Sequence, residues 1–164
     1  MKKKILMFTL MIFSVILVGC GENNSVEKNS QEKVSAAPVE NISEEKGMKK
    51  LKITVGEKIL YATLENNSTT QDFIKKLPTT LKMENLYGRE MCYRYGKGGL
   101  AESNFRSDRY EVGDIIYWAP RGSFVILYKQ NGEEFERVQV GHIDDDVKFF
   151  ENVGDVEIKF ELVD

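Results

Sequence analysis

The sequence is poor in the residues that most often build metal sites, hydrolytic centres and disulfide frameworks. It has one histidine, His142, and two cysteines, Cys20 and Cys92. A single histidine excludes a His–His ligand set. A His–Cys set is excluded as well, because Cys20 belongs to the N-terminal segment, whose predicted role is a different one. Ser-His-Asp chemistry would have to use His142 alone. We therefore expect no metal, no cofactor and no catalytic residue. His142 follows Gly141 at a predicted strand end, and we interpret it as a turn histidine near Asp144.

The sequence also lacks an apolar run long enough to cross a bilayer comfortably. Residues 2–4 are lysines, residues 5–18 are apolar apart from two hydroxyl residues, and Gly19 and Cys20 follow. This order resembles a bacterial lipoprotein signal peptide, which implies cleavage before Cys20 and a diacylglycerol on its thiol. An ordinary secretory peptide and an uncleaved anchor are the alternatives.

The lipoprotein resemblance implies a chain anchored to the cell membrane through Cys20 and facing outside the cytoplasm. Loss of residues 1–19 would remove three of 23 basic residues and leave all 26 acidic ones, so the formal charge falls from -3 to -6. Such an acidic chain is a poor candidate for nucleic acid and has no electrostatic attraction to an anionic bilayer. Only Cys92 would remain as a thiol, so no intrachain disulfide is expected and Cys92 is predicted to be buried and inert.

The composition divides the chain into three parts. Residues 1–19 form the predicted signal peptide. Residues 20–48 comprise the lipidated cysteine and a predicted flexible tether, which has no aromatic residue and is rich in Glu, Asn, Ser and Lys. Residues 49–164 form one predicted domain, whose apolar pattern runs from 51 to 163 over about 113 residues and is long enough to bury a core.

Strand patterns dominate the predicted domain. Apolar and polar residues alternate at 51–55 and 156–162. Further strands are predicted at 59–64, 79–87, 90–95, 115–118, 124–128 and 135–143. The apolar run 124–128 is typical of a central strand buried on both faces. About eight short strands favour a barrel or a sandwich over a parallel α/β sheet.

Helices and loops account for the rest of the domain. A hydroxyl cap within 68–70 precedes Phe73, Ile74 and Leu77, which share one helix face before Pro78 ends the helix. Residues 144–152 predict a shorter helix, and residues 96–109 predict a polar loop.

Two segments resemble ligand-binding motifs only superficially. Residues 96–99, Gly-Lys-Gly-Gly, lack the spacing and the Lys-Ser/Thr pair of a phosphate-binding loop, and we interpret them as a flexible turn. The acidic run 144–146 lacks the spaced oxygen ligands and central glycine of an EF-hand, and we interpret it as the start of a helix.

The order of elements resembles the cyclophilin-like fold. The resemblance rests on strand–turn–strand–helix at 52–77, on Gly113-Asp114-Ile115 leading to 122–126, and on 140–143 followed by 144–151. A bacterial group of cyclophilin-like domain proteins is more similar still, through Lys-Ile-Thr-Val-Gly at 52–56, Leu77-Pro78, Gly113-Asp114, Tyr117-Trp118 and Pro120. The resemblance implies a mainly β fold, a closed eight-stranded β-barrel with one or two short flanking helices.

The prolyl isomerase motif of cyclophilins is absent. Residues 89–99 contain neither Phe-His-Arg nor Gln-Gly-Gly, and Gly122-Ser123 is followed by Phe-Val-Ile. Arg94 stands in this region without the partners that the motif supplies. No catalytic residue is therefore assigned.

Aromatic residues and one arginine suggest a binding surface instead. Tyr93, Arg94, Trp118 and Phe124 lie at predicted strand ends, where rings and a guanidinium can hold a peptide or a small ligand. Core packing with snorkelling arginines is the alternative. We predict a non-catalytic, membrane-anchored binding module for a peptide, protein or small molecule. A divergent peptidyl-prolyl isomerase using Arg94 and a solute-binding transporter accessory are the alternatives.

Overall fold

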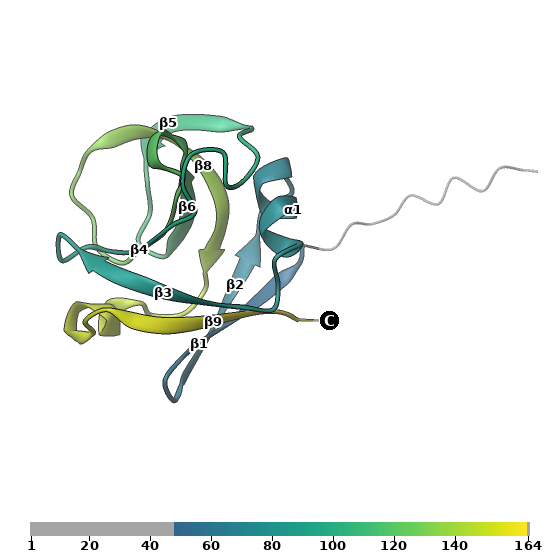
Figure 1. Cartoon of the computed structure of the whole chain (residues 1–164). Helices are drawn as coiled ribbons and strands as arrows, with labels where there is room; N and C mark the ends of the chain where they lie inside the picture. Colours follow the sequence, from purple (N-terminus) through teal and green to yellow (C-terminus); the bar gives the residue numbers. More distant parts are fainter. Residues whose placement is uncertain (1–47, 164) are drawn as a thin grey trace, which may run out of the picture. The chain divides into compact units, whose positions relative to one another are not determined.

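The computed structural model describes residues 48–163 (Figure 1). The predictions for residues 1–47, including the signal peptide, the tether and Cys20, lie outside the described residues. Within the described part no helix is long and apolar enough to span a membrane. Its elements are β1 (Lys50–Val55), β2 (Lys58–Leu64), α1 (Ser68–Ile74), β3 (Thr79–Leu86), β4 (Glu90–Arg94), β5 (Phe105–Arg109), β6 (Asp114–Trp118), η1 (Ala119–Arg121), β7 (Ser123–Leu127), β8 (Glu134–Ile143), η2 (Lys148–Asn152) and β9 (Val156–Val163).

The strands form a closed antiparallel barrel. Their order is β2-β1-β9-β3-β4-β7-β6-β8, and the pairing of Ala62–Leu64 with Gly141–Ile143 joins β8 back to β2. This closure confirms the predicted mainly β fold with an eight-stranded barrel. The additional strand β5 pairs with residues 134–138 of β8. It lies on the same edge of β8 that pairs with β2 at Gly141–Ile143. A closed barrel leaves no long strand edge for pairing with other chains.

Period-two alternation fills the barrel interior. Leu51 and Ile53 of β1 point inward and are fully buried, as are Ile158 and Phe160 of β9, while the residues between them are polar. Helix α1 covers the interior with Phe73, whose ring stacks on Phe124 at 4.4 Å between centroids. All of these apolar core residues lie between 51 and 160, so the segment 48–163 contains the complete barrel core.

Helix α1 begins and ends at residues other than those predicted. Its cap is Asn67, whose side chain accepts a hydrogen bond from the Thr70 amide at 2.9 Å, and not a hydroxyl of 68–70. Those hydroxyls bind elsewhere: Thr69 donates to the Ala101 carbonyl at 2.6 Å. The helix ends at Ile74, so Leu77 packs on the core from the following turn.

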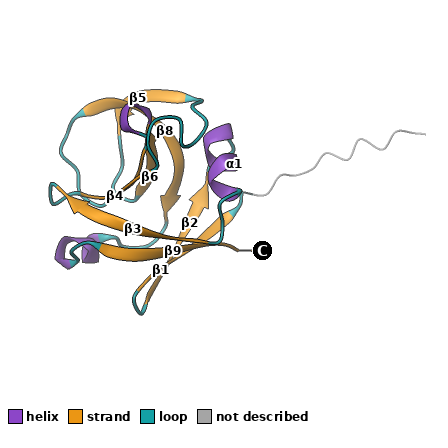
Figure 2. Cartoon of the chain, in the orientation of Figure 1, coloured by secondary structure: helices purple, strands orange, loops and turns teal. Residues whose placement is uncertain are grey.

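The predicted loop 96–109 is wrong at its C-terminal end, where β5 forms. Strand β5 reads Phe-Arg-Ser-Asp-Arg and has no apolar alternation, because most of its side chains are exposed. Its order comes from backbone pairing with β8 and from the contact between Asp108 and the buried Arg137. The predicted helix at 144–152 is the short 3₁₀-helix η2, with Phe150 buried (Figure 2).

The outside of the barrel carries a second apolar cluster. Most of it lies on β4, β7 and β6, where alternate residues point away from the core. These strands contribute Cys92, Ile116, Val125 and Leu127, and the loop before β6 contributes Tyr110. Leu86, Trp118 and Phe135 flank the cluster. Every residue of β7 is buried, which confirms a strand covered on both faces. Because barrel exteriors normally face water with polar residues, this apolar outer face is where the search for a site begins.

Candidate functional site

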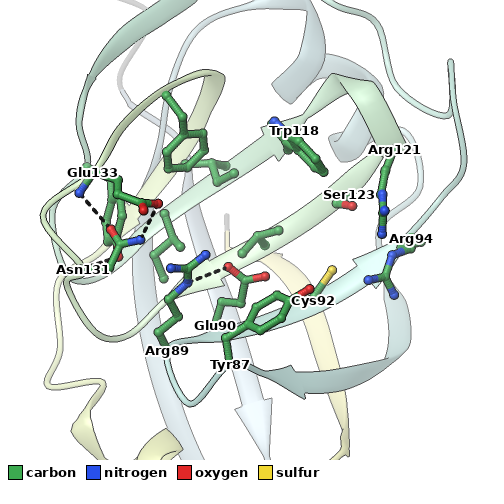
Figure 3. Close-up of a pocket in the computed structure, with 15 residues that line it drawn as sticks. Tyr87, Arg89, Glu90, Cys92, Arg94, Trp118, Arg121, Ser123, Asn131 and Glu133 are labelled. Carbon is green, nitrogen blue, oxygen red and sulfur yellow. Dashed lines mark hydrogen bonds and ion pairs between the residues drawn. The ribbon is translucent and has the colours of Figure 1, made fainter.

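A groove of about 360 Å³ lies over the outer apolar cluster (Figure 3). Its floor is apolar and comes from Cys92, Ile116, Val125 and Leu127. Its walls and ends hold the remaining lining residues, which are Tyr87, Arg89, Glu90, Arg94, Tyr110, Trp118, Arg121, Ser123, Asn131, Glu133 and Phe135. Concave apolar sites with a few polar groups at the rim are typical of small-ligand binding, and this volume lies at the small end of their range.

Strand alternation divides the four predicted surface residues into two pairs. Arg94 and Trp118 point outward and line the groove. Phe124 points inward, is fully buried and stacks on Phe73, so its assignment to a binding surface is wrong. Tyr93 also packs on the interior core, with its ring 4.9 Å from that of Tyr95, and does not line the groove.

The direct neighbours of the misplaced residues are the ones that reach the groove. Cys92 precedes Tyr93, while Ser123 and Val125 flank Phe124. In a strand, residues i and i+2 share a face, so Arg94 already implies Cys92 on the same side. Period two applied to β4 and β7 would therefore have identified these floor residues from the sequence.

Other lining residues come from loops that sequence patterns do not place. Tyr110 fixes the loop after β7, because its hydroxyl donates to the Lys129 carbonyl at 2.7 Å and accepts from the Asn131 amide at 3.0 Å. The side chain of Gln130 donates to the Tyr110 carbonyl. These contacts hold Asn131 and Glu133 at one end of the groove, and they join residues about 20 positions apart that carry no recognisable motif.

The opposite end of the groove is cationic. In Figure 3 the side chains of Arg94 and Arg121 both lie at this end. Arg94 Nη1 donates to Glu84 Oε2 at 2.8 Å, and this bond raises the pKa of the Arg94 guanidinium. Arg121 ends η1, and the left-handed Gly122 that follows packs so closely on the Gly96 carbonyl that no side chain would fit.

The end formed by Asn131 and Glu133 is more acidic. Asn131 Nδ2 donates to Glu133 Oε2 at 2.9 Å. Glu90 lies 3.6 Å from Arg89 and is mostly buried, with 15% of its side chain exposed. Burial raises the pKa of the Glu90 carboxyl, and Arg89 opposes this shift. The groove therefore has polar groups of opposite sign at its two ends and an apolar floor between them.

Cys92 is buried at the groove floor, as predicted. Burial raises the pKa of its thiol, so the reactive thiolate is disfavoured. The structure supports the interpretation of Cys92 as a packing residue.

His142 lies in a different environment from the one predicted. It belongs to β8, not to a turn, and its Nδ1 is 2.9 Å from Asp114 Oδ1. Asp144 instead accepts hydrogen bonds from Lys50 at 2.8 Å and from Thr63. Among residues 48–163 no three His, Cys, Asp or Glu side chains are grouped as metal ligands would be.

The fold and the groove define a class of protein, a closed antiparallel barrel with an apolar ligand-sized groove on its outer face. A family model, described as the cyclophilin-like family, matches residues 53–161, and the chain belongs to that family. The chain is similar to the solution structure of the hypothetical protein AF2241 from Archaeoglobus fulgidus. That match has a TM-score of 0.54 and 14% identity, covers 70% of this chain and 94% of the other, and shows the fold alone. No curated protein gives a significant match.

Proposed function

We propose that this protein is a membrane-anchored binding module that captures a ligand in the outer-face groove without catalysing a reaction. The observation that carries the proposal is the apolar outer face of β4, β7 and β6, which is hollowed into a groove of about 360 Å³. Apolar concavities with a few polar groups at the rim are typical of ligand-binding sites.

The polar groups at the groove support binding more than catalysis. Cys92 has a raised thiol pKa and is a poor nucleophile. His142 does not line the groove. Trp118 and Arg94 supply a ring and a cation beside an apolar floor, and these groups orient a ligand without needing to transfer a proton.

Binding at the groove is measurable through Trp118, because it is the only tryptophan of the chain. The sample is the predicted mature chain, residues 20–164 with Cys20→Ser, which retains the complete barrel core. A panel of small apolar molecules and short apolar peptides is titrated while Trp118 fluorescence is recorded. We expect at least one class to change the emission and to saturate.

Calorimetry on variants then locates the binding site. Trp118→Ala and Arg94→Ala should weaken binding by at least about fivefold, since contacts of this size are worth about 1 kcal/mol. The matched control is Tyr61→Ala, an exposed ring on β2 outside the groove. Unchanged binding by both groove variants would contradict the proposal.

Anchoring through Cys20 is a separate part of the proposal and is supported by the lipoprotein-like order of residues 2–20. It is tested in a bacterial host by incorporation of a labelled fatty acid and by partitioning of the chain into detergent. We expect Cys20→Ser to abolish both and Cys92→Ser to change neither. Label that persists in Cys20→Ser would contradict a lipid at this position.

A divergent peptidyl-prolyl isomerase is the second candidate, favoured by the position of Arg94 at the groove. A guanidinium beside a bound X–Pro bond could stabilise the amide nitrogen as its conjugation is lost, against a barrier of about 18–20 kcal/mol. A protease-coupled assay on X-Pro peptides distinguishes the two functions. Acceleration that disappears in Arg94→Gln would establish an isomerase, and binding without acceleration would leave the binding module.

A further inference from the structure

The two ends of the groove carry opposite charge, and this favours a ligand with a charged group at one end. The cationic end has Arg94 and Arg121, with Glu84 as the nearby acid. The far end has two acids, Glu90 and Glu133, with Arg89 as the nearby base. The formal charges are thus about one positive at the first end and one negative at the second, across an apolar floor.

The ion pair with Glu84 leaves Arg94 able to bind a second anion. A guanidinium carries five N–H donors in a fixed plane, and Glu84 takes one of them through Nη1. The pair is open to solvent, with 38% of the Arg94 side chain and 52% of the Glu84 side chain exposed. Such an exposed pair contributes little energy and exchanges readily, so it leaves the remaining donors of Arg94 available to another anion.

Arg121 provides a second guanidinium whose place is set by the backbone. It ends η1 directly before Gly122, whose backbone lies against that of Gly96. Within the described part of the chain Arg121 makes no ion pair and its side chain is exposed. Arg94 and Arg121 lie at the same end of the groove (Figure 3), so their positive charges add there and favour an anionic ligand.

We propose that the groove binds a small organic acid, with its carboxylate held by Arg94 and Arg121 and its apolar body on Cys92, Val125 and Ile116. This inference rests on the proposed binding function and names its ligand class. Charge-assisted hydrogen bonds from arginine are strong, and the planar guanidinium matches the geometry of a carboxylate. The volume of about 360 Å³ suits one small molecule more than a protein segment.

The test compares two ligands that differ only in charge, 3-phenylpropionate and 3-phenylpropionamide. Each is titrated into residues 20–164 with Cys20→Ser, and Trp118 fluorescence gives the dissociation constant. We expect the acid to bind at least about tenfold more tightly than the amide, as charged hydrogen bonds allow. Arg94→Gln and Arg121→Gln should each remove most of that preference. Arg109→Gln, an exposed arginine of β5 outside the groove, is the charge-matched control and should retain it.

The outcomes distinguish a failure of the small-acid inference from a failure of the proposed binding function. Equal binding of acid and amide would overturn the carboxylate site and leave the binding groove in place. A preference for the acid that survives in both groove variants would also overturn it, because the anion would then bind elsewhere. If neither small molecule binds but an apolar peptide does, the groove is a peptide site and the small-acid inference is wrong. If nothing binds, both the inference and the proposed function fail.

Discussion

Asp114 Oδ1 lies 2.9 Å from His142 Nδ1, and the two residues are direct cross-strand partners of β6 and β8. The other carboxylate oxygen of Asp114 accepts a hydrogen bond from the Glu111 amide at 2.9 Å and lies 3.9 Å from Arg137. Asp114 is therefore a buried carboxylate that contacts the Glu111 amide and His142 and lies near the Arg137 guanidinium, whereas the His142 side chain is 41% exposed.

This asymmetry predicts unequal effects of the two alanine variants. Asp114→Ala should lower the free energy of unfolding by about 2–3 kcal/mol, because the Glu111 amide loses its acceptor and the buried Arg137 guanidinium loses a nearby negative charge. His142→Ala should cost only about 1 kcal/mol or less, since Asp114 keeps its other partners. Urea unfolding followed by circular dichroism gives both values. Equal losses of stability would show that the contact between Asp114 and His142, and not the other contacts of Asp114, stabilises the pairing of β6 with β8.

Arg137 should be the most important charged residue for stability. Its side chain is fully buried, and Nη1 donates to the carbonyls of Asp108 at 2.7 Å and Phe135 at 3.3 Å. Arg137→Ala should cost about 2–4 kcal/mol through lost bonds and a new cavity. The neighbouring Arg106 also pairs with Asp108 but is 47% exposed, so Arg106→Ala should leave the urea midpoint nearly unchanged. A large loss in Arg106→Ala would mean that Asp108, not Arg137, holds β5 to the barrel.

Gly122 should tolerate no side chain, because a Cβ there would overlap the Gly96 carbonyl oxygen. Its φ of +60° adds a strain of about 1–2 kcal/mol for any other residue. Gly122→Ala should thus cost about 3 kcal/mol or more and displace Arg121 from the groove. Gly132 is the matched control, since its φ is also positive and no atom lies within 4 Å of its Cβ position. Gly132→Ala should cost only the strain, and thermal unfolding of the two variants measures the difference.

Acid should lower the stability of the protein by weakening the contacts of Asp144 beside the β2–β8 pairing. The hydrogen bond from Lys50 lowers the pKa of Asp144 below its ordinary value. A group whose folded pKa is depressed stabilises the protein fully above its unfolded pKa, about 3.9 for Asp, and loses that stabilisation as pH falls through the folded pKa. The urea midpoint should therefore drop between about pH 5 and pH 2, and less steeply in Asp144→Asn and Lys50→Gln. Lys82→Gln, at an exposed lysine of β3, should keep the steepness of the parent.

Period-two alternation and turn residues are local signals, so they predicted most of the strands and a barrel or a sandwich, and the resemblance to the cyclophilin-like fold implied the closed barrel. Leu51 to Val55 and Val156 to Leu162 show that pattern, and both segments are strands of the core. Strand β5 was missed because its order depends on Asp108 meeting Arg137, a contact across 29 positions. The pattern gives no sign of such a long-range ion pair.

The candidate site was predictable in part for the same reason. Arg94 and Trp118 were identified by residue type, and alternation would have excluded Phe124 and added Cys92 and Val125. The residues of the loop after β7 were not predictable, since hydrogen bonds to Tyr110 place them and such bonds leave no sequence period. Arg121 was not among the predicted surface residues, and it lines the groove from the end of η1, directly before the left-handed Gly122.

The most direct test of a ligand groove on the outer face is a map of amide chemical shifts in a titration with 3-phenylpropionate. The account predicts that the largest changes cluster at Cys92, Arg94, Ile116, Trp118 and Val125, while the β1 and β9 amides change little. Changes centred on β1, β2 and β9 instead, or spread evenly over the barrel, would contradict a ligand site on β4, β7 and β6.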